Sequence, residues 1–290
     1  MQHKNKTALE QCFTINGLRI AGKLWHPSSE KEGVIALHGW LDNANSFDLL
    51  APALSNQPFL ALDLPGQGKS DFRSAHAPYN IWSEIDEILQ ISHQLGWETF
   101  TLLGHSRGAA VASLLAGTFP ARISRLILIE GGIPHPGEDA HAPEQLAKAI
   151  TANRQIENNR STVFTTRNLA IAARQNGFTK VNEQAATILA ERALIEDRDG
   201  FSWRADPRIK IPSEVRLNRA QIMAFLKAIS APTLLINAKK GLFVDKPEAN
   251  DYFAAIEHLK RYDLEGGHHL HLEGAENEIA ELVSAFCVAK

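Results

Sequence analysis

The sequence predicts an α/β protein: a doubly wound, mostly parallel sheet with an inserted helical cap. Short apolar runs without a polar face alternate with segments of helical spacing, which is typical of a sheet covered by helices on both faces. Residues 133–230 lack any such run, and this block is far longer than an ordinary crossover. A G-x-S-x-G pentapeptide also lies between one apolar run and a helix rich in small residues.

The chain opens with an expected hairpin. Asn16 and Gly17 suit a type I′ turn, so residues 12–15 and 18–21 should pair. The next expected elements are strands at 34–37 and 59–62, a helix near 46–54 between them, and a helix at 81–95 that ends at Gly96.

The pentapeptide GHSRG at 104–108 is the centre of the prediction. An apolar strand at 99–103 must turn sharply there into a helix at 109–116, and the flanking glycines let the two elements approach closely. This geometry holds the Ser106 hydroxyl at the carboxyl edge of the sheet. The backbone N–H of Arg107, at the start of the helix, can then face a developing oxyanion.

The later elements divide the chain into two domains. The core comprises residues 1–132 and 231–290, and the cap comprises residues 133–230. Within the cap, residues 199–204 are expected to be a loop between helices. The other expected elements are strands at 126–129, 233–237 and 259–264, cap helices at 143–158, 162–175, 182–195 and 213–229, and core helices at 247–258 and 275–287.

Composition narrows the class of protein. A hydrophobic content of 44%, a charged content of 22% and a net charge of −3 are ordinary for a globular protein, and without a long basic run they favour neither nucleic acid nor an anionic membrane as partner. The polar N-terminus does not resemble a signal peptide, so we expect a cytoplasmic protein. Cys12 and Cys287, at opposite ends, indicate neither a disulfide framework nor a zinc site. The sequence gives no indication of oligomeric state.

A nucleophilic serine needs a base and a group that orients the base. His268 lies in a loop after a late strand, directly behind Gly266 and Gly267, and is the preferred base. His269 and His271 compete for this role. A metal cluster of these histidines is disfavoured, since cysteine ligands and a second spaced histidine pair are lacking.

The acid has two candidates. The loop after the strand at 233–237 is the usual place, but it reads Lys239-Lys240-Gly241, and the next acid along is Asp245. Glu130 is a lone charge at the end of a fully apolar strand. Its burial requires a partner, which an imidazole N–H would supply. Glu130 is therefore preferred, with Asp245 as the alternative.

The second oxyanion donor is expected just after His38-Gly39. The backbone N–H of Trp40 should pair with that of Arg107, with Leu41 as the alternative. His38 itself is expected to be structural.

The sequence around Gly68-Lys69-Ser70 is not a phosphate loop. Asp63 stands where that motif requires a glycine, so no nucleotide is implied, and no cofactor or metal is predicted. Among the cap aromatics, Trp203 is expected to line the substrate pocket.

The motifs HGWLDN (38–43), DLPGQGKS (63–70), GHSRG, IEGG (129–132) and GGHHLHLE (266–273) resemble the α/β-hydrolase superfamily, and within it the serine hydrolase-like proteins. The resemblance implies a nucleophile at Ser106 and a base at His268. An acid at Glu130 is a variant placement also seen in some haloalkane dehalogenases. The Lys239-Lys240-Gly241 stretch departs from the commoner pattern.

Two related activities are disfavoured. Dehalogenases and epoxide hydrolases use an aspartate where this chain has Ser106, and epoxide hydrolases use cap tyrosines, whereas Tyr79, Tyr252 and Tyr262 all lie outside residues 133–230. The expected function is a serine hydrolase that cleaves a small-molecule carboxylic ester or thioester through an acyl-enzyme. The alternatives are a C–C bond hydrolase with the same triad and a non-catalytic ligand-binding protein of this fold.

Overall fold

A computed structural model describes residues 7–30, 32–54, 57–156, 162–243 and 246–288. Its centre is an eight-stranded sheet in the order β1-β2-β4-β3-β5-β6-β10-β11. The strands are β1 (Leu9–Ile15), β2 (Leu18–Trp25), β3 (Val34–Leu37), β4 (Phe59–Leu62), β5 (Phe100–His105), β6 (Ile123–Ile129), β10 (Thr233–Ala238) and β11 (Leu259–Leu264).

The sheet confirms the predicted fold class. β3, β4, β5, β6, β10 and β11 are parallel, whereas β2 pairs antiparallel with both β1 and β4. The hairpin turns at Asn16 and Gly17, whose φ angles of 52° and 80° are those a type I′ turn requires.

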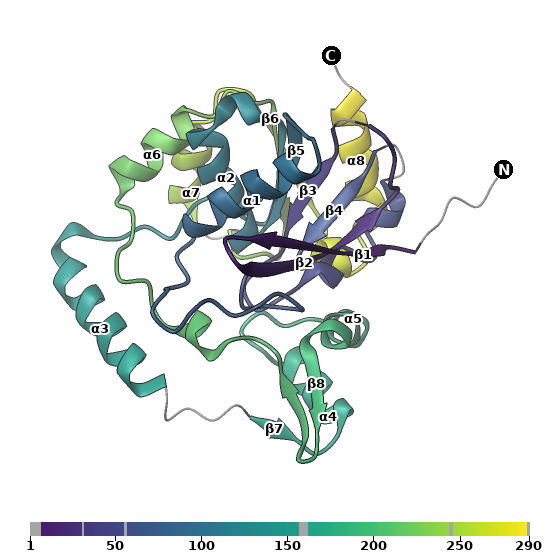
Figure 1. Cartoon of the computed structure of the whole chain (residues 1–290). Helices are drawn as coiled ribbons and strands as arrows, with labels where there is room; N and C mark the ends of the chain where they lie inside the picture. The colour runs from purple at the N-terminus through teal and green to yellow at the C-terminus, as the bar shows by residue number, and fades with distance from the viewer. Residues whose placement is uncertain (1–6, 31, 55–56, 157–161, 244–245, 289–290) are drawn as a thin grey trace.

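Helices cover both faces of the sheet (Figure 1). α1 (Ser83–Gln94), α2 (Arg107–Thr118), α6 (Arg219–Lys227) and α7 (Pro247–Phe253) contribute to one hydrophobic core, and α8 (Glu276–Val288) contributes to the other. Neighbouring strand residues alternate between the two cores: Leu102 and Leu128 face one, Leu103 and Ile129 the other. This two-sided burial is why the inner strands, such as β3 and β4, are continuously apolar, whereas the edge strands β1 and β11 carry exposed polar residues.

Residues 133–230, the predicted cap and called the cap below, contain strands as well as helices. Besides α3 (Ala142–Gln155), α4 (Arg167–Gln175) and α5 (Glu183–Ala193), the cap contains a three-stranded antiparallel sheet of β7 (Val163–Phe164), β9 (Gly200–Trp203) and β8 (Leu194–Asp197). The expectation of a cap without strands was wrong, and so was the loop assigned to 199–204. These strands have two to four residues, none of them buried, so they leave no apolar run.

The remaining differences are smaller. The expected helix near 46–54 is two short 3₁₀ turns, η1 (Ala44–Phe47) and η2 (Ala51–Ala53). α6 falls within the predicted cap range but packs on the core through Ile222 and Leu226. In the described part of the chain, no helix has both the length and the hydropathy needed to cross a bilayer.

Polar side chains attach α5 to the core. Asn43 and Asn45 donate side-chain hydrogen bonds to the carbonyls of Leu189 and Ile188. Arg192, near the end of α5, makes an ion pair with the fully buried Asp63, with its Nε 2.7 Å from Oδ2. Figure 1 shows α4, α5 and the small sheet together at one side of the core, with α3 set apart from them.

Candidate active site

Ser106 lies at the sharp junction of β5 and α2. Its φ of 53° and ψ of −116° place a non-glycine residue in the strained left-handed half of the map. A side chain at Gly108 would collide with the backbone carbonyls of Leu37 and His38, so the first turn of α2 rests directly on the end of β3. The Ser106 N–H donates to the carbonyl of Ile129 (3.0 Å), which ties the turn to β6.

His268 lies between Ser106 and Glu130. Its Nε2 is 2.9 Å from Ser106 Oγ, and its Nδ1 is 3.1 Å from Glu130 Oε2. Because an ionised carboxylate only accepts hydrogen bonds, Nδ1 carries the hydrogen, and Nε2 presents its lone pair to the serine hydroxyl. The side chains preferred from the sequence therefore form one hydrogen-bonded chain.

The Glu130 carboxylate is fully buried and accepts two backbone hydrogen bonds. Oε1 accepts from the Ala238 N–H (2.6 Å) and Oε2 from the Leu242 N–H (2.9 Å). Both donors belong to the segment that contains Lys239-Lys240-Gly241, and a side chain at Gly241 would collide with the carboxylate. The loop after β10 has no acid at 239–241, and it packs instead against the Glu130 carboxylate, which follows the neighbouring strand β6. Asp245, the alternative acid, lies outside the described residues.

The two competing histidines have other partners. His269 Nε2 is 2.9 Å from Asp42 Oδ2, and His271 Nε2 is 2.9 Å from Ser46 Oγ. Burial lowers the pKa of His271 to about 3, so its ring stays neutral. His268 is the one that reaches Ser106.

The predicted oxyanion donors lie at the start of α2 and after β3. As the first residue of α2, Arg107 has a backbone N–H without an acceptor inside the helix. Its guanidinium is held by both oxygens of Glu84, at 3.0 and 2.9 Å. The Leu41 N–H donates to Gln67 Oε1 (2.7 Å), so Leu41 is already engaged, which leaves Trp40 as the better candidate after His38-Gly39.

Trp40 also contacts the cap. Its indole N–H donates to the carbonyl of Ile209 (3.3 Å), and its ring packs edge-on against Phe178. His38 is structural, as expected: its Nδ1 is 2.7 Å from the carbonyl of Gly39, and its Nε2 accepts from the Leu64 N–H (3.0 Å). Phe178 itself is 86% exposed, so the aromatic side chains of the cap are not all buried.

A cavity of about 490 Å³ lies between the core and the cap. Trp203 lines it from β9, and Leu41, Asp42 and Gly68 line it from the core. The remaining lining residues come from residues 133–230 and are mostly small or apolar: Ala152, Gln155, Ile156, Thr162, Ala173, Arg174, Gly177, Ala193, Ala205, Pro207, Lys210 and Ile211.

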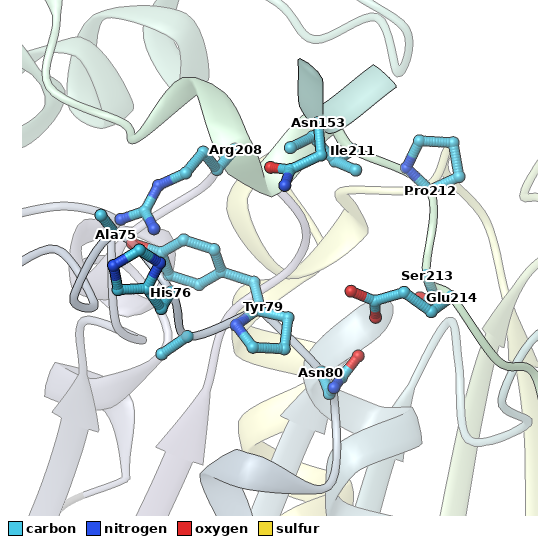
Figure 2. A pocket seen from close by; sticks show the side chains of 12 residues that line it. Ala75, His76, Tyr79, Asn80, Asn153, Arg208, Ile211, Pro212, Ser213 and Glu214 are labelled. Carbon is cyan, nitrogen blue, oxygen red and sulfur yellow. The ribbon is translucent and has the colours of Figure 1, made fainter. Parts of the chain in front are cut away.

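A second cavity of about 210 Å³ lies farther along the border between core and cap. Figure 2 shows Arg208 beside Tyr79 and His76 at the left of the view and Glu214 across from them at the right. Tyr79 donates to Asp206 (2.7 Å), and burial raises the pKa of its phenol, so it stays protonated. Tyr79 therefore connects core and cap.

Behind His268 lies a buried polar network that was not predicted from the sequence. Three residues could in principle bind a metal ion, because one carboxylate oxygen of Asp42 and one ring nitrogen each of His105 and His269 lie within 4.8 Å of one another. The Asp42 oxygens are taken, however, by His269 and by Arg174 of α4, whose Nη2 is 2.9 Å from Oδ1. His269 Nε2 must carry a hydrogen to bond a carboxylate, so this nitrogen has no lone pair to offer a metal, and the ring's Nδ1 has no hydrogen-bond partner among the described residues. This donor set fits an ion-pair network. Its sequence signals are the Asp of HGWLDN and the His of GHSRG.

Comparison with known proteins agrees with the geometry. The family model for the alpha/beta hydrolase fold matches residues 34–275. The chain is 29% identical to a serine hydrolase-like protein of Dictyostelium discoideum, over 89% of this chain and 75% of that one.

Two solved structures are also similar. A hypothetical protein of Pseudomonas aeruginosa PAO1 is 38% identical with a TM-score of 0.93, covering 97% of this chain and 99% of that one. A thioesterase domain from the curacin biosynthetic pathway is 26% identical with a TM-score of 0.84, covering 96% and 99%. The chain belongs to the α/β-hydrolase fold family.

Proposed function

We propose that this protein is a serine hydrolase that cleaves a small-molecule carboxylic ester or thioester through an acyl-enzyme intermediate. One observation carries the proposal: His268 is hydrogen-bonded to Ser106 Oγ through Nε2 and to the buried Glu130 carboxylate through Nδ1. Nucleophile, base and orienting acid in this order are what acyl transfer by a serine requires.

Acylation begins when Ser106 Oγ attacks the substrate carbonyl and gives its proton to His268 Nε2. Glu130 holds the imidazole in the correct tautomer and stabilises the imidazolium that forms. The backbone N–H groups of Arg107 and Trp40 are proposed to bind the oxyanion of the tetrahedral intermediate. Its collapse expels the alcohol or thiol, which takes the proton from His268. Water then repeats the sequence and releases the acid.

The cap cavity is proposed to take the acyl group. One of its lining residues, Leu41, follows the proposed donor Trp40 in the chain, and half of the lining consists of alanine, isoleucine and proline together with Trp203. Such a lining suits an acyl chain of modest length. The similarity to a thioesterase domain supports a thioester as one form of the substrate.

The test is labelling with a fluorophosphonate probe, which modifies only an activated serine. Labelling of the full chain at Ser106, and its loss in Ser106→Ala, are expected. Turnover of a short p-nitrophenyl ester should fall by several orders of magnitude in the same variant. A folded wild-type chain that is neither labelled nor active on esters and thioesters would overturn the proposal in favour of a non-catalytic binding protein. Labelling without turnover of either would favour C–C bond hydrolysis.

A further inference from the structure

We propose that Arg174, in cap helix α4, is a positioning residue for His268 and that it acts through Asp42 and His269. The proposal rests on the serine hydrolase function proposed above, because it concerns the base of that reaction. It assigns the cap a part in catalysis beyond forming the pocket.

A continuous set of buried contacts joins the cap to the base. Arg174 Nη1 donates to the carbonyl of Thr179 (2.9 Å), which fixes the guanidinium, and Nη2 donates to Asp42 Oδ1 (2.9 Å). The other oxygen of Asp42 accepts from His269 Nε2 (2.9 Å). Asp42 and His269 are only 3% and 1% exposed. Since His269 follows His268 in the chain, its ring fixes one side of the loop that carries the base.

The core fixes the other side of this loop. His105, the residue before Ser106, lies with its Nε2 2.8 Å from the carbonyl oxygen of His268. A carbonyl only accepts, so His105 donates from Nε2. The rings of His105 and His269 are 4.9 Å apart between centroids. The backbone of His268 is thus held between a residue of the nucleophile turn and a residue controlled by Asp42 and Arg174.

Asp42 and Arg174 form an ion pair behind this loop. Burial alone would raise the pKa of Asp42, but His269 and Arg174 hold it well below its usual value, so Asp42 is an anion paired with a cation. Burial and the other histidines hold the pKa of His105 well below its usual value.

His271 packs against His105, with ring centroids 4.2 Å apart. Burial lowers the pKa of His271 to about 3, so the rings of His105 and His271 are both neutral. The charges that face His268 from the described elements are Glu130 at its Nδ1 and, behind His269, the pair formed by Asp42 and Arg174.

Breaking this pair from either side should shift the acid limb of kcat/KM in opposite directions. Arg174→Met leaves an uncompensated anion, which favours the imidazolium of His268. Asp42→Asn leaves an uncompensated cation, which disfavours it. The base must be neutral to act, so the acid limb of kcat/KM should shift to higher pH in the first variant and to lower pH in the second. We expect about half a pH unit each way.

The experiment measures kcat/KM against pH for p-nitrophenyl acetate, a substrate too short to fill the cap cavity. Arg174→Met should lose about tenfold at the optimum, mainly in kcat. Arg174→Lys keeps the cation and should restore the position of the acid limb. Arg167→Met is the matched control: Arg167 lies on the same helix, but its contact with Glu191 is long (3.9 Å) and exposed, so its profile should match the wild type.

The opposite shifts separate positioning from a general loss of stability. If Arg174→Met behaves like Arg167→Met, or if it shifts the limb in the same direction as Asp42→Asn, the proposal is wrong. If thermal unfolding shows that Arg174→Met is not folded, the test depends on Asp42→Asn alone. The proposal is then wrong if the acid limb of kcat/KM in Asp42→Asn does not shift to lower pH. Wild-type protein that no fluorophosphonate labels would mean a failure of the serine hydrolase function instead.

Discussion

The strand ends of the core and the cap beside them hold their functional groups by different means. Ser106 and Glu130 directly follow β5 and β6, and His268 lies four residues after β11, so the sheet itself brings them together. The cap reaches the core through long side chains: Arg174 to Asp42, and Arg192 to Asp63.

This difference separates chemistry from selectivity. Backbone geometry fixes the proposed reaction centre, with Ser106 and Glu130 both at positive φ and Glu130 held by two N–H groups. Side-chain ion pairs fix the cap, which can therefore change sequence without disturbing the sheet. Changes at the strand ends should reduce turnover. Changes in the cap, apart from those at Arg174, should alter stability or substrate preference.

Apart from loss of the nucleophile itself, Glu130→Gln should have the largest effect on turnover. Glutamine keeps the size but removes the charge that orients His268 and stabilises its protonated form. By analogy with other triads, turnover of a p-nitrophenyl ester should fall about a thousandfold or more. The matched control is Asp245→Asn, for which we expect little loss under the same assay. An inactive Asp245→Asn variant and an active Glu130→Gln variant would show that the triad acid lies in the loop after β10, at Asp245.

Arg192→Met tests the cap side of the comparison. It removes one partner of a buried ion pair. Within the described part of the chain, the fully buried Asp63 carboxylate then keeps only the backbone N–H groups of Ala44 and Lys69 as donors. Losing one partner of such a pair costs about 3–5 kcal/mol in the free energy of unfolding. Chemical denaturation should show this loss.

The control for Arg192→Met is Arg219→Met. Because Arg219 pairs with the exposed Asp251, this substitution should lower the free energy of unfolding by less than about 1 kcal/mol. Equal stabilities of the two variants would mean that α5 is not held by Arg192.

Gly241→Ala returns to the core and should have a smaller effect. A methyl group there meets the Glu130 carboxylate, so either the loop or the acid must move. We expect a loss of about 1–3 kcal/mol in stability together with reduced turnover. Unchanged turnover in Gly241→Ala would show that the acid tolerates displacement.

The inner strands of the core could be predicted because they are buried on both faces, which leaves a continuous apolar run such as Leu126–Ile129 in the sequence. Glu130 stood out because a lone charge ends that run. Its environment could not be predicted: the donors at Ala238 and Leu242 are backbone groups more than 100 residues away, and backbone groups leave no sequence signal.

The cap was predicted less well for a physical reason. β8 and β9 are four residues each and only partly buried or exposed, so they have no strand-like pattern. The pairing of Arg192 with Asp63 joins residues 129 positions apart, and that of Arg174 with Asp42 joins residues 132 apart. Nothing local in the sequence marks such long-range pairs, so Asp42 and Arg174 were missed.

Trp203→Ala should have the smallest effect on rate and the clearest effect on preference. Trp203 lines the cap cavity and packs edge-on against Phe164, with ring centroids 6.3 Å apart. Removing the indole widens the cavity and removes apolar contact with an acyl chain that fills it. A p-nitrophenyl acetate barely enters the cavity, so its kcat/KM should hardly change.

For a hexanoate or octanoate ester, kcat/KM relative to acetate should change about tenfold, which corresponds to about 1.4 kcal/mol of apolar contact. Phe164→Ala is the matched control, because it removes a ring that packs on Trp203 while Trp203 still lines the cavity. It should leave the ratio between chain lengths close to the wild-type value. Equal losses on every chain length in Trp203→Ala would mean that the residue supports the cap without contacting the acyl group, and the cavity would then not be the acyl site.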